Sequence, residues 1–171
     1  MIGSFRKKGL AAASAVIAVA GLALTSVPAQ AAEPGVTANS VKLGITVPMT
    51  GIAAPGYSKV APAMKAYFDY VNANGGINGR KIQLIIEDDR YLPQEAVIKT
   101  NKLILRDKVF AIVGALGTAN NLAINSRVRL GARGVPSLFV NTGFIGFADN
   151  YNYPPIVPAL LLLCDGSQGH G

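Results

Sequence analysis

Short apolar runs recur along the chain and alternate with stretches in which apolar residues follow a helical period. Bounded apolar runs of this length are typical of buried strands. They occur at Val41–Val47, Lys81–Glu87, Val109–Val113 and Val135–Val140. The second run alternates apolar with polar residues, which favours a position near the edge of a sheet.

Three helices are predicted between these strands. The first follows a loop over Gly51–Tyr57, takes Ser58 as its N-cap, and has an apolar face of Val60, Met64, Tyr67, Phe68 and Val71. The second begins at Pro93 and has an apolar stripe of Ala96, Val97, Thr100, Leu103 and Ile104. The third takes Thr118 as its N-cap and closes at Gly131 or Gly134.

Regular alternation of strand and helix with short connections predicts an α/β fold. The expected architecture is a doubly wound parallel sheet with helices on both faces. Parallel sheets bind ligands outside the carboxyl ends of their strands. We therefore expect function at Leu116–Thr118 and Asn141–Gly143, which follow two adjacent strands.

The N-terminus has the pattern of a cleaved secretory signal peptide. Basic residues at Arg6–Lys8 precede an apolar core at Leu10–Leu24 and small residues spaced as Ala-x-Ala at Val27–Ala31. The core is shorter than the roughly 20 residues of a membrane-spanning helix, although an uncleaved anchor is the alternative. We expect cleavage after Ala31 and export to the periplasm or the extracellular space. No cysteine lies in the cleavage region after the core, so we expect no lipid anchor there.

Charge and reactive side chains narrow the function further. The net charge of the whole chain is +7, but the 13 basic and 9 acidic residues left after signal removal give +4 and are scattered. This pattern does not support a nucleic-acid partner. With one cysteine (Cys164) and one histidine (His170), the chain can form no intramolecular disulfide, and neither histidine catalysis nor a multi-histidine metal site is expected.

The last residues change in character after Tyr153. A proline-rich segment leads into four leucines and a Gly-rich end. We expect a signal peptide at residues 1–31, one domain at 32–153, and a tail at 154–171 that lies outside the fold. A terminal helix packed on the sheet is the alternative for the tail.

The sequence lacks the common loops of enzymes that bind phosphate or attack esters. It contains no GxxxxGK[ST], GxGxxG or GxSxG pattern. Asp88 and Asp89 are adjacent carboxylates, and in an extended segment they would point to opposite faces. We therefore expect no enzymatic activity, no cofactor and no metal site.

The residues at the strand ends are suited to a small anion or zwitterion. Free backbone N–H groups and the helix dipole at Gly117–Thr118 favour a carboxylate, and the groups of Asn141–Gly143 can accept from an ammonium. Tyr57 would supply an aromatic wall. Each feature has a simpler alternative, namely an N-cap, a turn and a surface aromatic.

Several segments together resemble one family. VKLGITVPMTG, NANGGINGRKI, LIIEDDRY, FAIVGALGT and GVPSLFVNTGF are similar to the first lobe of leucine/isoleucine/valine-binding proteins, the periplasmic substrate-binding components of branched-chain amino-acid ABC importers. The resemblance covers residues 40–153. It implies a monomeric two-lobed type I periplasmic-binding fold that delivers a ligand to a permease.

The resemblance also assigns roles at the cleft. The turn matching Gly117–Thr118 holds the ligand carboxylate, the carbonyl matching Leu116 faces the ligand, and the strand end matching Asn141, Thr142 and Gly143 holds the ammonium. The aromatic matching Tyr57 lines the cleft. A ligand-sensing receptor ectodomain of the same fold, or a non-functional fragment, is the alternative.

This chain departs from the family in two places. Phe144–Ile145 replaces a Ser or Thr that is usual in amino-acid binders, which leaves amides, aromatic acids and other small metabolites open as ligands. The second lobe is absent, from which we expect a truncated or frame-shifted product that alone binds its ligand weakly or not at all.

Overall fold

The structure, a computed structural model, describes residues 33–158. The predicted signal peptide and the residues after 158, including the leucine run, Cys164 and His170, lie outside the described part.

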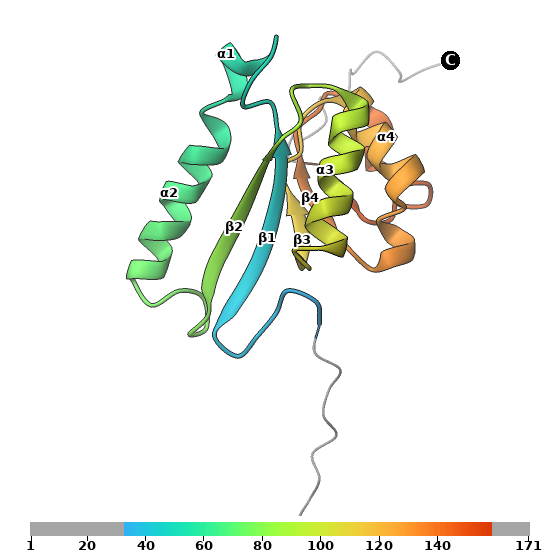
Figure 1. The fold of residues 1–171 in the computed structure, drawn as a ribbon. Helices are drawn as coiled ribbons and strands as arrows, with labels where there is room; N and C mark the ends of the chain where they lie inside the picture. The colour runs from blue at the N-terminus through green and yellow to red at the C-terminus, as the bar shows by residue number, and fades with distance from the viewer. Residues whose placement is uncertain (1–32, 159–171) are drawn as a thin grey trace, which may run out of the picture. The chain divides into compact units, whose positions relative to one another are not determined.

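Strands and helices alternate along the chain (Figure 1). In order they are β1 Ser40–Val47, α1 Ala54–Tyr57, α2 Val60–Ala73, β2 Lys81–Asp88, α3 Pro93–Leu105, β3 Ala111–Val113, α4 Thr118–Val128, the 3-10 turn η1 Gly131–Arg133, β4 Ser137–Val140, the 3-10 turn η2 Ile145–Ala148, and β5 Ile156–Pro158.

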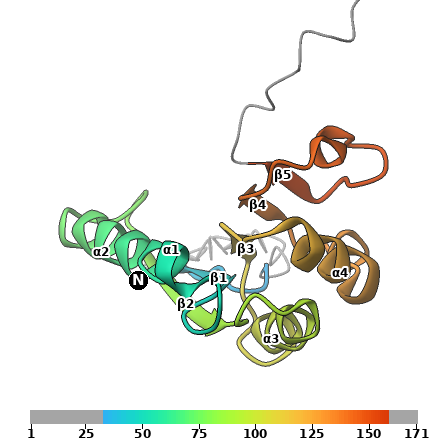
Figure 2. The ribbon, with the colours of Figure 1, turned by 90° about the horizontal axis from the view of Figure 1, so that it is seen from above.

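The five strands form one parallel sheet in the order β2-β1-β3-β4-β5. The chain adds β2 on one side of β1 and then β3, β4 and β5 on the other, which makes the sheet doubly wound. Helix α2 covers one face, and α3 and α4 cover the opposite face (Figure 2). The predicted α/β architecture is confirmed, as is the position of β2 at an edge.

Two apolar layers hold the helices on the sheet. The larger lies under α3 and α4 and includes Leu103, Ile112, Ile124 and Val128, all at most 2% exposed. Leu103 packs so closely on β1 that a Cβ at Gly44 would lie 2.9 Å from its Cδ1. The smaller layer, under α2, contains Ile45, Val47, Ala61 and Val113.

The helix boundaries differ from the predictions where local turns intervene. Ala54–Tyr57 is a single helical turn rather than a loop, so Ser58 is helical and closes α1 instead of capping α2. Tyr67 is 63% exposed and not on the buried face, where Ala61 lies instead. Helix α4 ends at Val128, because the next residue, Arg129, takes a left-handed conformation with φ 56°.

The first residues of the expected tail belong to the sheet. Ile156–Pro158 form β5 beside β4, and the Ser137 N–H donates to the carbonyl of Pro155 at 2.7 Å. Ile156 is buried with Val140 and Phe147. The fold therefore extends beyond the boundary expected at residue 153, because Ile156 packs into a buried cluster with residues of the domain.

Candidate ligand-binding site

The loops after β1, β2, β3 and β4 meet at the carboxyl edge of the sheet. A pocket of about 300 Å³ lies there. The structure brings together in it all seven residues singled out from the sequence, and adds Tyr91; the lining is Tyr57, Tyr91, Leu116, Gly117, Thr118, Asn141, Thr142 and Gly143. In a doubly wound sheet this edge is the expected place for a ligand.

The segments after β3 and β4 continue to pair beyond the strands. The Asn141 N–H donates to the carbonyl of Ala115 at 2.9 Å, and the Gly117 N–H donates to the carbonyl of Asn141 at 3.0 Å. The expectation that the Gly117 N–H is free was therefore wrong, and the Asn141 carbonyl is engaged as well. This pairing fixes the distance between the two sides of the pocket.

Helix α4 points its N-terminus into the pocket. Its N-cap is Gly117 rather than Thr118, and no side chain caps it. The N–H groups of Thr118, Ala119 and Asn120 have no acceptor within residues 33–158. Free N–H groups at the positive end of an 11-residue helix favour an anion.

A pair of threonine hydroxyls lies beside these N–H groups. Thr118 Oγ1 lies 2.6 Å from Thr142 Oγ1, which also accepts a hydrogen bond from the Phe144 N–H at 3.1 Å. One hydroxyl must donate to the other, so one proton of the pair stays available for a ligand. The pair therefore adds a further donor to the anion-binding side.

Two acceptors lie on the pocket lining close to these donors. The backbone carbonyls of Leu116 and Thr142 accept no hydrogen bond within the described chain. A carbonyl at a pocket can bind an ammonium or another N–H donor. The lining thus offers donors and acceptors to a small ligand that carries both charges.

Two tyrosines form the aromatic part of the pocket. Tyr57 ends α1 and is 38% exposed, while Tyr91 follows β2 and is 41% exposed. A Cβ at Gly117 would lie 2.7 Å from Tyr91 Cε2, so the ring is in close contact with the N-cap of α4. Sequence reasoning missed Tyr91, although its position just after a strand end was a usable signal.

Asp88 and Asp89 point in opposite directions, as the sequence predicted. Asp88 Oδ1 accepts from the N–H groups of Met49 and Arg90, both at 2.9 Å. Asp89 is fully buried; its Oδ1 accepts from the Tyr91 N–H at 2.9 Å and its Oδ2 from Asn120 Nδ2 at 3.3 Å. The two carboxylates share no site, and no cluster of three potential metal ligands occurs within residues 33–158.

The environments of these two carboxyls shift their pKa values in opposite directions. Burial raises the pKa of Asp89 above its ordinary value, although the hydrogen bonds from Tyr91 and Asn120 oppose the shift. Burial also acts to raise the pKa of Asp88, but the hydrogen bonds from Thr50, Arg90 and Met49 outweigh it and lower the pKa. Each shift follows from contacts that hold the chain around the pocket.

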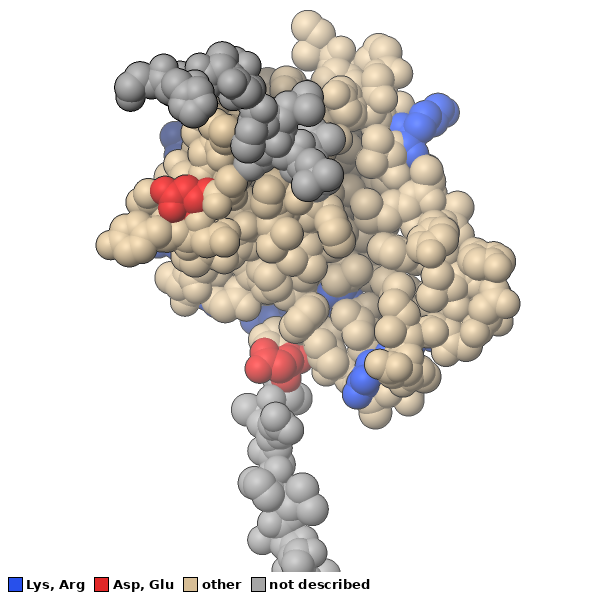
Figure 3. All heavy atoms as spheres, turned by 180° about the vertical axis from the view of Figure 1, so that it is seen from behind, with Lys and Arg blue, Asp and Glu red and all other residues tan. Residues whose placement is uncertain are grey.

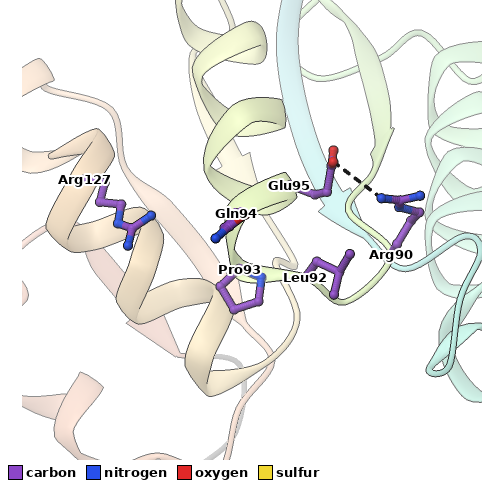
Figure 4. A pocket seen from close by; sticks show the side chains of 6 residues that line it. All are labelled: Arg90, Leu92, Pro93, Gln94, Glu95 and Arg127. Carbon is purple, nitrogen blue, oxygen red and sulfur yellow. Dashed lines mark ion pairs between the residues drawn. The ribbon is translucent and has the colours of Figure 1, made fainter.

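A larger cavity of about 550 Å³ lies between α3 and α4, away from the ends of β3 and β4 (Figure 4). Arg90 turns its side chain there and pairs with Glu95, with 3.5 Å between Nη2 and Oε1. Arg127 lies on the opposite wall. The cavity contains none of the strand-end groups described above, so we place the site at the smaller pocket.

Lys, Arg, Asp and Glu side chains are few and isolated on the face shown in Figure 3. Among the described residues, no helix is both long and apolar enough to cross a membrane.

Comparisons with known proteins agree with the fold. The family model described as periplasmic binding protein matches residues 40–159. Two proteins of Pseudomonas aeruginosa are similar: an amino acid binding protein, 38% identical over 74 residues, and a leucine-, isoleucine-, valine-, threonine- and alanine-binding protein, 33% identical over 101 residues. These matches cover 43% and 58% of this chain.

A solved structure extends the comparison to another ligand. The fatty acid ABC transporter substrate-binding protein from Thermomonospora curvata is 33% identical, with a TM-score of 0.54 over 61% of this chain. The matched regions span 20% and 24% of the two Pseudomonas relatives and 26% of the Thermomonospora chain.

Proposed function

Because the chain belongs to the periplasmic binding protein family, we propose that it is an extracytoplasmic solute-binding protein of an ABC importer. Its ligand in this proposal is a branched-chain amino acid or a related small polar molecule. The chain supplies one wall of the binding cleft, at the carboxyl edge of its sheet.

The observation that carries this proposal is the arrangement of free polar groups at the pocket. The N–H groups of Thr118 and Ala119 and the proton of the Thr118–Thr142 pair suit a carboxylate. The carbonyls of Leu116 and Thr142 suit an ammonium. An α-amino acid carries both groups on the same carbon atom, and the 300 Å³ volume accommodates a molecule of this size.

The fatty acid-binding relative provides the main competing ligand class. A fatty acid shares the carboxylate but has no ammonium, so it would leave both carbonyls without a donor, at a cost of about 1–3 kcal/mol for each one buried. Phe144–Ile145 stands where the resemblance places a Ser or Thr, and the Phe144 ring packs edge to face on Phe147 with 5.1 Å between ring centres. Because this chain lacks the hydroxyl that amino-acid binders usually have there, the proposed ligand class also includes amides and aromatic acids.

Export and delivery to a permease belong to the same proposal. In this proposal the signal peptide is cleaved after Ala31 and the exported protein has no lipid anchor. It is a monomer and has no enzymatic activity. A receptor ectodomain of the same fold is the second candidate. Association with a permease in membranes would separate the importer component from the receptor.

The test is an NMR titration of the ¹⁵N-labelled chain with L-leucine, L-isoleucine and L-valine at millimolar concentrations. We expect the amide signals of Thr118, Ala119 and Asn120 to shift, and Thr142→Val to weaken this response. Ser126→Ala, on the exposed side of the same helix, is the matched control. Octanoate and isopentylamine each carry one of the two charged groups. A response to octanoate as strong as that to leucine would exclude the amino-acid assignment, and no response to any of them would refute the site.

A further inference from the structure

The wall formed by Tyr91 has a backbone that L-amino acids rarely adopt. Arg90 and Tyr91 are consecutive residues with φ of 51° and 63°. The left-handed region costs about 1 kcal/mol or more for each residue other than glycine. Two such residues in a row persist only where the surroundings fix them. The ring of Tyr91 cannot supply all of this stabilisation, since the side chain is 41% exposed.

A backbone bond from the Leu92 N–H to the Asp89 carbonyl at 2.8 Å closes this turn, and the side chains of the two preceding aspartates accept further hydrogen bonds from it. Asp88 accepts from the Arg90 N–H and Asp89 from the Tyr91 N–H, each two residues ahead and each at 2.9 Å. The second oxygen of Asp89 accepts from Asn120 in the first turn of α4. Asp89 therefore connects the tyrosine wall with the helix whose N-terminus forms the polar side of the pocket.

We propose that Asp89 is a positioning residue of the pocket, which holds the Tyr91 ring against Gly117 at the N-terminus of α4. Asp88 supports it by fixing Arg90 in the same turn. The inference deepens the proposed function, because the wall limits the space beside the carboxylate-binding groups. The placement of the ring, however, is testable without any ligand.

The local geometry explains why this residue type is required. The Asp89 side chain is fully buried and reaches two donors on different elements, one through each oxygen. Asparagine has the same shape and one acceptor oxygen, so it can still hold the Tyr91 N–H. Alanine leaves both donors without their acceptor, and the turn keeps only its backbone bond from the Leu92 N–H to the carbonyl of residue 89.

The experiment measures the ring-current shift of the Gly117 Hα protons by NMR in the complete chain. Tyr91→Leu defines the part of the shift that depends on the ring. We expect Asp89→Ala to remove this ring-dependent part and Asp89→Asn to retain it. Asp149→Ala is the matched control, because Asp149 accepts from the N–H of Tyr151 at 2.9 Å in the same local motif, outside the pocket.

If Asp89→Ala does not fold, hydrogen exchange of the wild-type chain provides a second test. The Tyr91 amide should exchange with solvent more slowly than that of exposed Tyr151, because its acceptor is buried. A retained ring-current shift in folded Asp89→Ala, its loss in Asp89→Asn, or fast exchange of the Tyr91 amide would each overturn the positioning role. If the shift behaves as expected but no amino acid binds, only the proposed ligand fails.

Discussion

Replacing Gly117 by alanine should destabilise the fold through two separable effects. Gly117 has φ of 92°, a conformation that costs an L-residue about 1–3 kcal/mol. The added Cβ would also lie 2.7 Å from Tyr91 Cε2, and overpacking of this kind typically costs about 1–3 kcal/mol. The loss of glycine flexibility in the unfolded chain returns about 0.5–1 kcal/mol. We therefore expect a net decrease of about 2–4 kcal/mol in the free energy of unfolding.

Other variants separate the two effects. Gly134 has φ of 67° and open space around its Cβ position, so Gly134→Ala reports the backbone cost alone. Gly143 has neither a positive φ nor a close neighbour, so Gly143→Ala should change the stability little. Tyr91→Ala removes the ring, and in that background Gly117→Ala should lose about 1–2 kcal/mol of its effect.

Urea unfolding followed by far-UV circular dichroism measures each free energy, provided that the denaturant slope is unchanged. The reasoning would be refuted if Gly117→Ala cost the same with and without the Tyr91 ring. It would also be refuted if Gly117→Ala cost no more than Gly134→Ala, since the ring contact would then contribute nothing.

Four further predictions concern the two carboxylates, the core and the affinity. Because the pKa of Asp89 is raised in the fold, its ionisation destabilises the folded state as pH rises through and above its ordinary value of 3.8. The stability of the wild type relative to Asp89→Asn should therefore decrease as pH rises above 3.8 and show no such change below it, as measured by urea unfolding at each pH. The pKa of Asp88 is lowered, so Asp88→Asn should lose stability at pH 7, and this difference from wild type should vanish as pH falls below 3.8. Leu103→Ala should cost about 2–5 kcal/mol in the same assay, and a cost below 1 kcal/mol would contradict its packing on Gly44. Finally, calorimetry should show amino-acid binding weaker than micromolar, because the pocket is open and leaves part of such a ligand in contact with water; tighter binding would contradict this expectation.

The sequence was sufficient for the order of elements and for most of the pocket. The strands around Ile45 and Ile112 are apolar runs with clear borders, and Pro93 and the glycines after α2 mark helix ends unambiguously. Alternation of these elements determines a parallel sheet, and the carboxyl ends of its strands must then share an edge. For this reason the sequence alone predicts that Thr118 and Thr142, which are 24 positions apart, lie at the same edge of the sheet.

The remaining features depend on contacts that no local pattern encodes. Thr118 has the residue type of an N-cap, yet its hydroxyl pairs with Thr142 because the extended pairing of the two strand ends brings them within 2.6 Å. Ile156 is in a segment with neither a strand nor a helical period, and it joins the sheet because Val140 and Phe147 form a buried surface beside it. Tyr91 follows a strand end that the sequence shows, but its ring reaches Gly117 through a turn in which Arg90 and Tyr91 are left-handed, and no local pattern reveals that turn.

The distribution of polar groups determines which substitutions can change ligand choice. The proposed contacts to a carboxylate and an ammonium are mainly backbone N–H and C=O groups, fixed by the bond between the Gly117 N–H and the Asn141 carbonyl. Side-chain substitutions cannot remove these groups, so the capacity to bind such a ligand belongs to the fold. Selectivity must therefore come from the side chains that border them, namely Tyr57, Tyr91 and the Thr118–Thr142 pair. Of these, Tyr91 is held by a buried carboxylate outside the pocket, so we expect substitutions of Asp89 to change ligand selectivity without any change in a residue that lines the pocket.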